Sequence, residues 1–282
     1  MTLVERTSVD SIEMEERKHS LSLCVKMLES ASKQCKNWTA EQRLLAMEVL
    51  LKATETSLLF NMPHVAVSVS AVAKRIAYRS SSRDVEVKLL RALIEINCGA
   101  AILEMASSVS QDRDDQDRIR LEASKHAVEA TRLAAAAAST EIMQRATETY
   151  WNAVCGFLSS PSSRQLVSSD VNEVIELLHG FVVRCGPNSM NPSMRSRLYR
   201  ARLDFMRDIS EWERGTNECE RFMPLLPAVE CKTVLEMRLI FLSRLGRANQ
   251  GGVSSREGDI DSHSKVGLLR LFFFGRHFGL NH

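Results

Sequence analysis

The sequence predicts an all-α protein made of antiparallel helical hairpins stacked as an α-solenoid, followed by an irregular C-terminal tail. Of the 282 residues, 44% are hydrophobic and only 6% aromatic, and the strong helix formers Ala, Leu, Met, Glu and Arg are abundant. The first 98 residues contain no Gly and one Pro, whereas seven of the twelve Gly residues follow residue 245. Since Gly and Pro break regular structure, we expect long helices and then an irregular segment.

Apolar periodicity and turn signals together predict nine helices. Their ranges are about 11–35, 38–60, 63–79, 83–109, 113–138, 140–158, 169–185, 192–213 and 217–244. Thr39 with Gln42 three residues later forms a capping-box pattern, and Pro63 suits a first helical turn. "SSPSS" is expected to follow the sixth helix, "RCGPNSMNP" to separate the seventh from the eighth, and "ERG" to end the eighth.

Two of these helices have informative apolar patterns. In 192–213 one narrow stripe is apolar, formed by Met194, Leu198, Ala201, Phe205, Ile209 and Trp212. This helix is therefore expected to bury one face and expose the other.

In 83–109 two adjacent bands are apolar, with Lys88, Arg91 and Glu95 as a narrow polar strip between their outer edges. A helix that is apolar on two faces is packed on two sides, as an inner member of a stack would be.

Residues 132–142, "RLAAAAASTEI", contain five consecutive alanines. Upstream, Ala123, Ala127, Ala130 and Ala134 follow helical steps and form a stripe of small side chains. Such a stripe lets two helix backbones approach closely. Because Ser139 and Thr140 offer caps immediately afterwards, 113–138 and 140–158 are expected to form an antiparallel hairpin.

This hairpin resembles the tetratricopeptide repeat family, whose helical pairs meet at small residues and stack into solenoids. "ASKHAVEATRL" is similar to the second helix of such a repeat, although Ala127 occupies the position of an aromatic residue. "ATETYWNAV" and the long Ala/Leu/Ser-rich hairpins look like those of the large cilia- and flagella-associated tetratricopeptide proteins. The resemblance implies a cytoskeletal, axonemal scaffold that binds axonemal or microtubule-associated proteins.

Five residues are candidates for partner binding. Arg197, Arg200 and Arg207 are expected on one helix face, where they would contact phosphate or an acidic partner. The alternative is a simple solvated face. Tyr150 and Trp151 are either large packing residues or part of a partner pocket.

The sequence contains no catalytic, cofactor-binding or metal-binding motif, so we expect no cofactor and no enzymatic activity. "QDRDDQDRIRLE" at 111–122 fails as a calcium loop because it lacks the Gly and Glu that the loop requires. Its aspartates are expected near a helix N-terminus instead. The seven histidines are isolated in sequence and are expected at the surface or at helix ends.

The remaining features bear on organisation and location. We expect a helical-repeat domain over 1–246 and a linker with a poorly ordered tail over 247–282. The apolar cluster at 265–278 is expected either to dock onto another helix or a membrane surface, or to be the end of a truncated product. A net charge of +2, seven scattered cysteines, and the lack of a signal peptide or membrane span indicate a cytoplasmic protein without nucleic-acid partners.

The expected function is therefore a non-enzymatic scaffold for protein–protein interaction. Two other classes stay open. One is an all-α ligand-binding or enzymatic bundle, which would require a pocket with convergent polar groups. The other is an RNA-binding helical repeat, which would require the exposed arginines.

Overall fold

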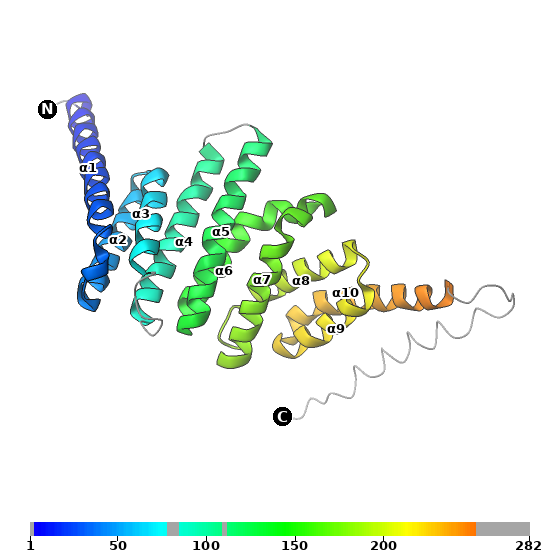
Figure 1. Ribbon diagram of the computed structural model, residues 1–282. Helices are drawn as coiled ribbons and strands as arrows, with labels where there is room; N and C mark the ends of the chain where they lie inside the picture. Colours follow the sequence, from blue (N-terminus) through cyan, green and yellow to red (C-terminus); the bar gives the residue numbers. More distant parts are fainter. Residues whose placement is uncertain (1–2, 78–84, 109–111, 252–282) are drawn as a thin grey trace. The chain divides into compact units, whose positions relative to one another are not determined.

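The computed structural model describes residues 3–77, 85–108 and 112–251. Within these ranges it contains ten α-helices, three short 3-10 helices and no strand (Figure 1). This confirms the all-α class. The α-helices are α1 (Leu3–Ser32), α2 (Ala40–Leu59), α3 (Pro63–Ala77), α4 (Val85–Ser108), α5 (Arg113–Ala137), α6 (Thr140–Val154), α7 (Pro161–Cys185), α8 (Pro192–Asp208), α9 (Trp212–Phe222) and α10 (Ala228–Gly251). The 3-10 helices are η1 (Cys35–Asn37), η2 (Cys155–Ser159) and η3 (Met223–Leu225).

Local capping sets several of the helix starts. Thr39 Oγ1 accepts a hydrogen bond from the Gln42 amide at 3.2 Å, and the Gln42 side chain accepts one from the Thr39 amide at 2.9 Å. This confirms the expected capping box at α2. Asp112 caps α5 by accepting from the Asp114 amide at 3.1 Å, so the acidic cluster does mark a helix N-terminus. Both devices satisfy backbone donors that have no partner inside the helix.

The hairpin of α5 and α6 forms as expected. Ala138 ends α5 in the left-handed conformation, with φ 53°, and the Ser139 hydroxyl accepts a hydrogen bond from the Ile142 amide of α6. The two helices then pack against each other along their lengths. The four alanines of the predicted stripe are all fully buried. Small side chains therefore bring α5 close to its neighbours.

Helix α4 is packed on two sides, as its two apolar bands predicted. It contacts α2 and α3 on the N-terminal side of the chain and α5 and α6 on the other. Val87 and Ile94 belong to the core shared with α1–α3, whereas Ile96 and Ile102 belong to the core shared with α5–α10. Thus α4 joins two hydrophobic cores.

The most extensive helix contacts join helices that are one or two positions apart in the chain. Examples are α3 with α4, α5 with α7, and α7 with α8 (Figure 1). Each helix therefore packs mainly on its near neighbours in sequence. Local packing of this kind keeps most tertiary contacts short in sequence.

Three predicted helix boundaries are displaced in the structure, one of them by a cap that the prediction missed. Helix α7 begins at Pro161 rather than at 169, because the Ser160 hydroxyl accepts from the Ser163 amide at 3.2 Å and Pro161 occupies the first turn. Helix α6 ends at Val154 instead of 158, and the next five residues form η2. Helix α1 begins at Leu3 rather than at 11.

The prediction of two helices over 192–213 and 217–244 is wrong. The chain forms three helices here, α8, α9 and α10. The first break lies at Ser210, whose φ is 61°, and Ile209 beside it is 60% exposed instead of buried. Gly215 does not end a helix but lies inside α9, where the Phe241 ring packs on its Cα.

The chain divides into two compact units, residues 1–242 and 243–282. In the second unit the structure describes only the last turns of α10, which continue through Gly251. The first five residues of the predicted linker and tail at 247–282 are therefore helical. The rest of that linker and the apolar cluster at 265–278 lie outside the described residues. None of the helices in the described part of the chain is long and apolar enough to cross a membrane.

Candidate functional site

A buried carboxylate lies at the junction of α3, α4 and α5. Glu95 is fully buried, and its Oε2 lies 2.7 Å from His126 Nδ1 and 3.1 Å from the Ser70 hydroxyl that donates to it. The cations nearest its other oxygen are Lys74 and Arg91, at 3.7 and 3.9 Å. These partners stabilise the buried carboxylate, because a buried charge without partners costs several kcal/mol.

The same cluster brings a thiol, an imidazole and a carboxylate together. Cys98 Sγ lies 3.6 Å from His126 Nε2, on the ring edge opposite Glu95. Burial, followed by the charge of Glu95, raises the pKa of the Cys98 thiol far above its usual range. A nucleophilic cysteine needs a depressed pKa and access to substrate, and Cys98 has neither. The arrangement is therefore suited to packing rather than to covalent catalysis.

Sequence reasoning missed this cluster because it placed every histidine at the surface or at helix ends. His126 is only 6% exposed, which corrects that expectation. The signal was present in the alanine stripe, since His126 directly precedes Ala127 and lies three residues after Ala123. Within the described residues no group of three His, Cys, Asp or Glu side chains is arranged to hold a metal ion.

Ion pairs continue from Glu95 across neighbouring helices. Arg91 of α4 contacts Glu129 of α5 at 2.5 Å, and Arg132 of α5 contacts the same carboxylate at 2.9 Å. Arg132 also donates to Glu173 of α7 at 2.8 Å. We call this series the charge ladder; its members are Lys74, Glu95, Arg91, Glu129, Arg132 and Glu173. It links side chains of α3, α4, α5 and α7.

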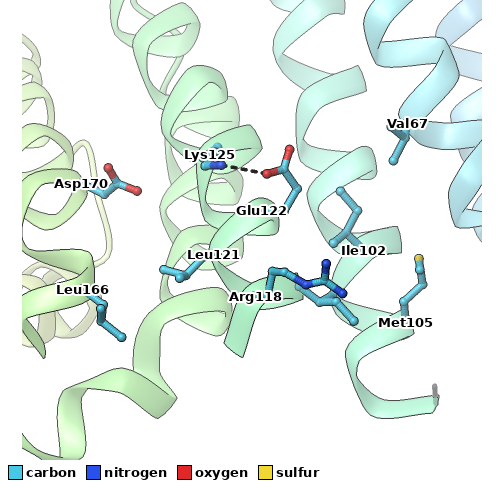
Figure 2. A pocket seen from close by; sticks show the side chains of 10 residues that line it. Val67, Ile102, Met105, Arg118, Leu121, Glu122, Lys125, Leu166 and Asp170 are labelled. Atoms are coloured by element: carbon cyan, nitrogen blue, oxygen red, sulfur yellow. Dashed lines mark hydrogen bonds and ion pairs between the residues drawn. The ribbon is translucent and has the colours of Figure 1, made fainter. Parts of the chain in front are cut away.

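A groove of about 660 Å³ crosses the same four helices (Figure 2). Its apolar lining comes from every one of them: Val67 of α3, Ile102 and Met105 of α4, Ile119 and Leu121 of α5, and Leu166 of α7. Val67 and Leu166, at its two ends, are 41% and 62% exposed. Exposed apolar side chains gathered in a concave surface are typical of binding sites.

Charged side chains of both signs border this groove. Lys125 and Glu122 form an ion pair at 2.9 Å, which lowers the pKa of Glu122. Arg118 lies beside them, and Asp170 of α7 accepts a hydrogen bond from Ser124 at 3.3 Å. Figure 2 shows Glu122 and Lys125 paired on α5, with Asp170 beyond them on α7. An apolar floor with a charged rim resembles the core and rim of many protein interfaces.

The sequence offered a partial signal for the groove. Val67 lies two residues from each of the buried Val65 and Val69, and Leu166 precedes the buried Val167. These positions are out of step with the buried face of their own helix. An apolar residue at such a position faces something other than the helix's own core.

The two aromatic candidates for partner binding, Tyr150 and Trp151, differ in burial. Tyr150 is fully buried, which corrects its assignment as a contact residue and leaves the packing alternative. Trp151 is half-buried on the same helix, and the guanidinium of Arg197 lies over its ring at 5.9 Å from the centroid. The structure therefore brings Trp151 and Arg197 together as a cation–π pair between α6 and α8.

The other two candidate arginines are already paired within α8. Arg200 contacts Asp204 at 3.1 Å and Arg207 contacts the same residue at 3.0 Å. The three arginines therefore do not act together as an unpaired basic face. This arrangement agrees with the alternative of a solvated face on which ion pairs form.

Two other arginines of α8, which the sequence did not single out, are buried instead. Arg195 donates to the carbonyl oxygens of Leu225 at 2.7 Å and Pro187 at 2.6 Å, and so ties together two connecting segments. Arg202 is 4% exposed and lies between Glu176 of α7 and Glu218 of α9. A guanidinium has five donors in a fixed fork, which suits it to joining several acceptors.

Arg221 completes this second cluster between α7 and α9. It donates to both oxygens of Glu176, at 2.9 and 2.7 Å, and to His179 Nε2 at 3.1 Å. These hydrogen bonds hold the pKa of Glu176 at about 2. Burial, with the charge of Arg221 as the next cause, lowers the pKa of His179. The cluster is a structural joint between helices.

Comparison with known proteins adds little. No family model matches the chain, and no curated protein matches it. A solved structure described as "Computational Design of Self-Assembling Cyclic Protein Homooligomers" is similar over 82% of this chain and 99% of its own, with 13% identity and a TM-score of 0.37. So loose a similarity assigns neither function nor assembly to this chain.

Proposed function

We propose that the protein is a non-enzymatic scaffold of stacked helical pairs, similar to tetratricopeptide repeats, that binds other proteins. The preference of each helix for its near neighbours in sequence supports an open stack, because a repeat array depends on such contacts. The charge ladder supports it further, since it joins one helix to the next across four members of the stack. An array of this kind presents a long and stiff binding surface.

The observation that carries the proposal is the apolar groove across α3, α4, α5 and α7. Three steps between adjacent helices, each about 8–10 Å, give it a length of about 24–30 Å. A helix rises 1.5 Å per residue, so about 16–20 residues of a partner helix would fill this length. We infer that the groove receives an amphipathic helix whose apolar residues recur every three or four positions.

The enzymatic alternative has one specific arrangement to consider, Cys98 with His126 and Glu95. The Cys98 thiol is fully buried and its pKa is raised. Both properties argue against a catalytic role for this arrangement and favour the scaffold. The RNA-binding alternative depended on Arg197, Arg200 and Arg207. Two of these are paired with Asp204, which weakens that alternative.

A ciliary or flagellar role rests on the sequence resemblance alone. We propose it as the setting for the scaffold, with axonemal proteins as partners. A tagged chain expressed in ciliated cells should then concentrate in the axoneme. A signal confined to the cell body would contradict this setting and leave the binding activity itself to be tested separately.

The binding activity is tested by capture with matched variants. Leu166→Asp places a charge in the groove, whereas Leu45→Asp places one at the corresponding sixth residue of α2. The two leucines are 62% and 61% exposed, so both substitutions should be tolerated by the fold. Proteins captured by the wild type and by Leu45→Asp, but lost with Leu166→Asp, support the proposal. Equal capture by all three chains, or by none, contradicts it.

A further inference from the structure

Helix α1 has two apolar faces, and the part of the chain that the structure describes covers only one of them. Its inner face packs against α2 and α3 through Val25, which is 4% exposed, and through Ser32, which accepts a hydrogen bond from Arg75 at 2.8 Å. Leu23 and Met27 lie on the opposite side of the helix, about 200° from Val25 at 100° per residue. They are 53% and 66% exposed.

The outer face forms a continuous stripe. Its members follow steps of three, four and four residues and are all exposed: Ser20, Leu23, Met27 and Ala31. Cys24 lies at its edge. Helix α4 also has two apolar faces, and other helices cover both of them. By the same physical rule, the outer stripe of α1 is suited to contact with another helix.

The charged residues along this stripe indicate which kind of partner helix would bind it. Lys26 and Lys33 are exposed along one edge of the stripe, and Arg17 lies along the other. Glu15 and Glu16 lie at the N-terminal end of the stripe, and Glu15 is paired with Lys18 at 2.7 Å. Glu29 lies about 200° from Met27. Between residues 17 and 33 the edges of the stripe are therefore basic.

We propose that the outer face of α1 binds an amphipathic helix of another protein, one whose apolar stripe is flanked by aspartate or glutamate. Basic edges attract acidic ones and repel basic ones, which sets the specificity of a helix pair. Two copies of α1 in antiparallel contact would place their lysine edges together, which disfavours self-association. A membrane-binding helix uses larger apolar residues such as Trp, Phe and Leu, and this stripe has two large side chains among small ones. The surface is separate from the groove, so the two are tested by different variants.

The direct test is protection of Cys24 in the full-length protein. The probe is a 21-residue peptide of three heptads, with Leu at positions a and d and Glu at e and g; the control peptide has Lys at e and g. Mass spectrometry would measure the alkylation rate of each cysteine. The Glu peptide should slow alkylation of Cys24 by fivefold or more, while the exposed Cys155 and Cys185 keep their rates.

Two variants complete the test. Met27→Glu should abolish the protection because it places a charge in the stripe. The double variant Lys26→Glu, Lys33→Glu should weaken binding of the Glu peptide about tenfold and improve binding of the Lys peptide. The proposal is overturned if neither peptide protects Cys24, if both protect it equally, if raising the protein concentration alone protects it, or if only phosphatidylserine vesicles do.

Discussion

Glu95 of α4 and His126 of α5 meet with their Oε2 and Nδ1 atoms 2.7 Å apart, where both side chains are almost completely removed from solvent. The backbones approach closely at the same place: a Cβ on Gly99 would lie 3.3 Å from the Ala123 carbonyl oxygen and 3.6 Å from His126 Cβ. Small residues therefore admit a buried polar pair between two closely packed helices. The pair and the alanine stripe belong to one structural feature.

The first prediction concerns this pair. Glu95→Ala should lower the free energy of unfolding by about 3–5 kcal/mol, because it leaves Ser70 and His126 without their acceptor. The double variant with His126→Ala should show a coupling energy of about 0.5–3 kcal/mol. Urea unfolding of the four proteins of the cycle measures both values. Strictly additive effects would mean that the two side chains do not stabilise each other.

The second prediction concerns the end of the alanine run. Ala138 has a φ of 53°, a conformation that favours glycine, so Ala138→Gly should stabilise the protein by about 1 kcal/mol. The same substitution at the exposed Ala136, inside α5, should destabilise it by up to about 1 kcal/mol. Thermal or urea unfolding compares the two. The same sign at both positions would refute the left-handed end of α5.

The third prediction concerns Gly215. A Cβ at this position would lie 2.6 Å from the Phe241 ring, and both residues are buried. Gly215→Ala should therefore destabilise the protein by about 1–3 kcal/mol through overpacking. Gly180→Ala in α7 is the matched control, since its Cβ would meet only the tip of Arg184, at 3.9 Å. It should be neutral or stabilise by up to about 1 kcal/mol.

These positions show what sequence reasoning was able to recover. Caps that depend on neighbouring residues, such as Thr39 with Gln42 and Ser139 after the alanines, were predictable because their partners lie within a few residues. The break at Ser210 was not, since a non-glycine residue rarely adopts positive φ and the sequence gives no sign that Ser210 does. Gly215 was mistaken for a helix end because its real role depends on a ring 26 residues away.

The candidate sites divide in the same way. The two faces of α4 and the small stripe of α5 were visible as periodic patterns. The sequence did not show that Arg195 is buried and Arg197 exposed. Both lie in one arginine-rich helix, and only acceptors from other segments, such as the Leu225 carbonyl, distinguish them. The groove combines residues from four helices, and a single sequence does not specify which of them converge.

The fourth prediction concerns acid stability. Hydrogen bonds from Arg221 hold the pKa of Glu176 at about 2, below the value of about 4.3 for a free glutamate. The stabilisation is therefore fully present above the unfolded value and is lost as the pH falls through about 2. Glu176→Gln should lower stability at neutral pH and match the wild type near pH 2. Equal stability of Glu176→Gln and the wild type at neutral pH would mean that the Arg221 hydrogen bonds do not stabilise the fold.

The fifth prediction concerns thiol reactivity. Cys98 and Cys219 are fully buried, and burial raises the pKa of both thiols, that of Cys219 to about 12. Since the thiolate is the reactive form, neither should be alkylated in the folded protein at pH 8. Cys24, Cys155 and Cys185 are exposed and should react first. Rapid alkylation of Cys98 would contradict its burial and would support the enzymatic alternative.

Site-specific photo-crosslinking in cells tests the binding groove most directly. A photoreactive phenylalanine analogue at position 166 lies at the end of the groove on α7, and the same analogue at position 45 lies on the equally exposed surface of α2. The scaffold account predicts a discrete crosslinked protein from position 166 that is absent from position 45 and is lost when Val67→Asp is added. Identical crosslinks from both positions, or none from position 166, would contradict it.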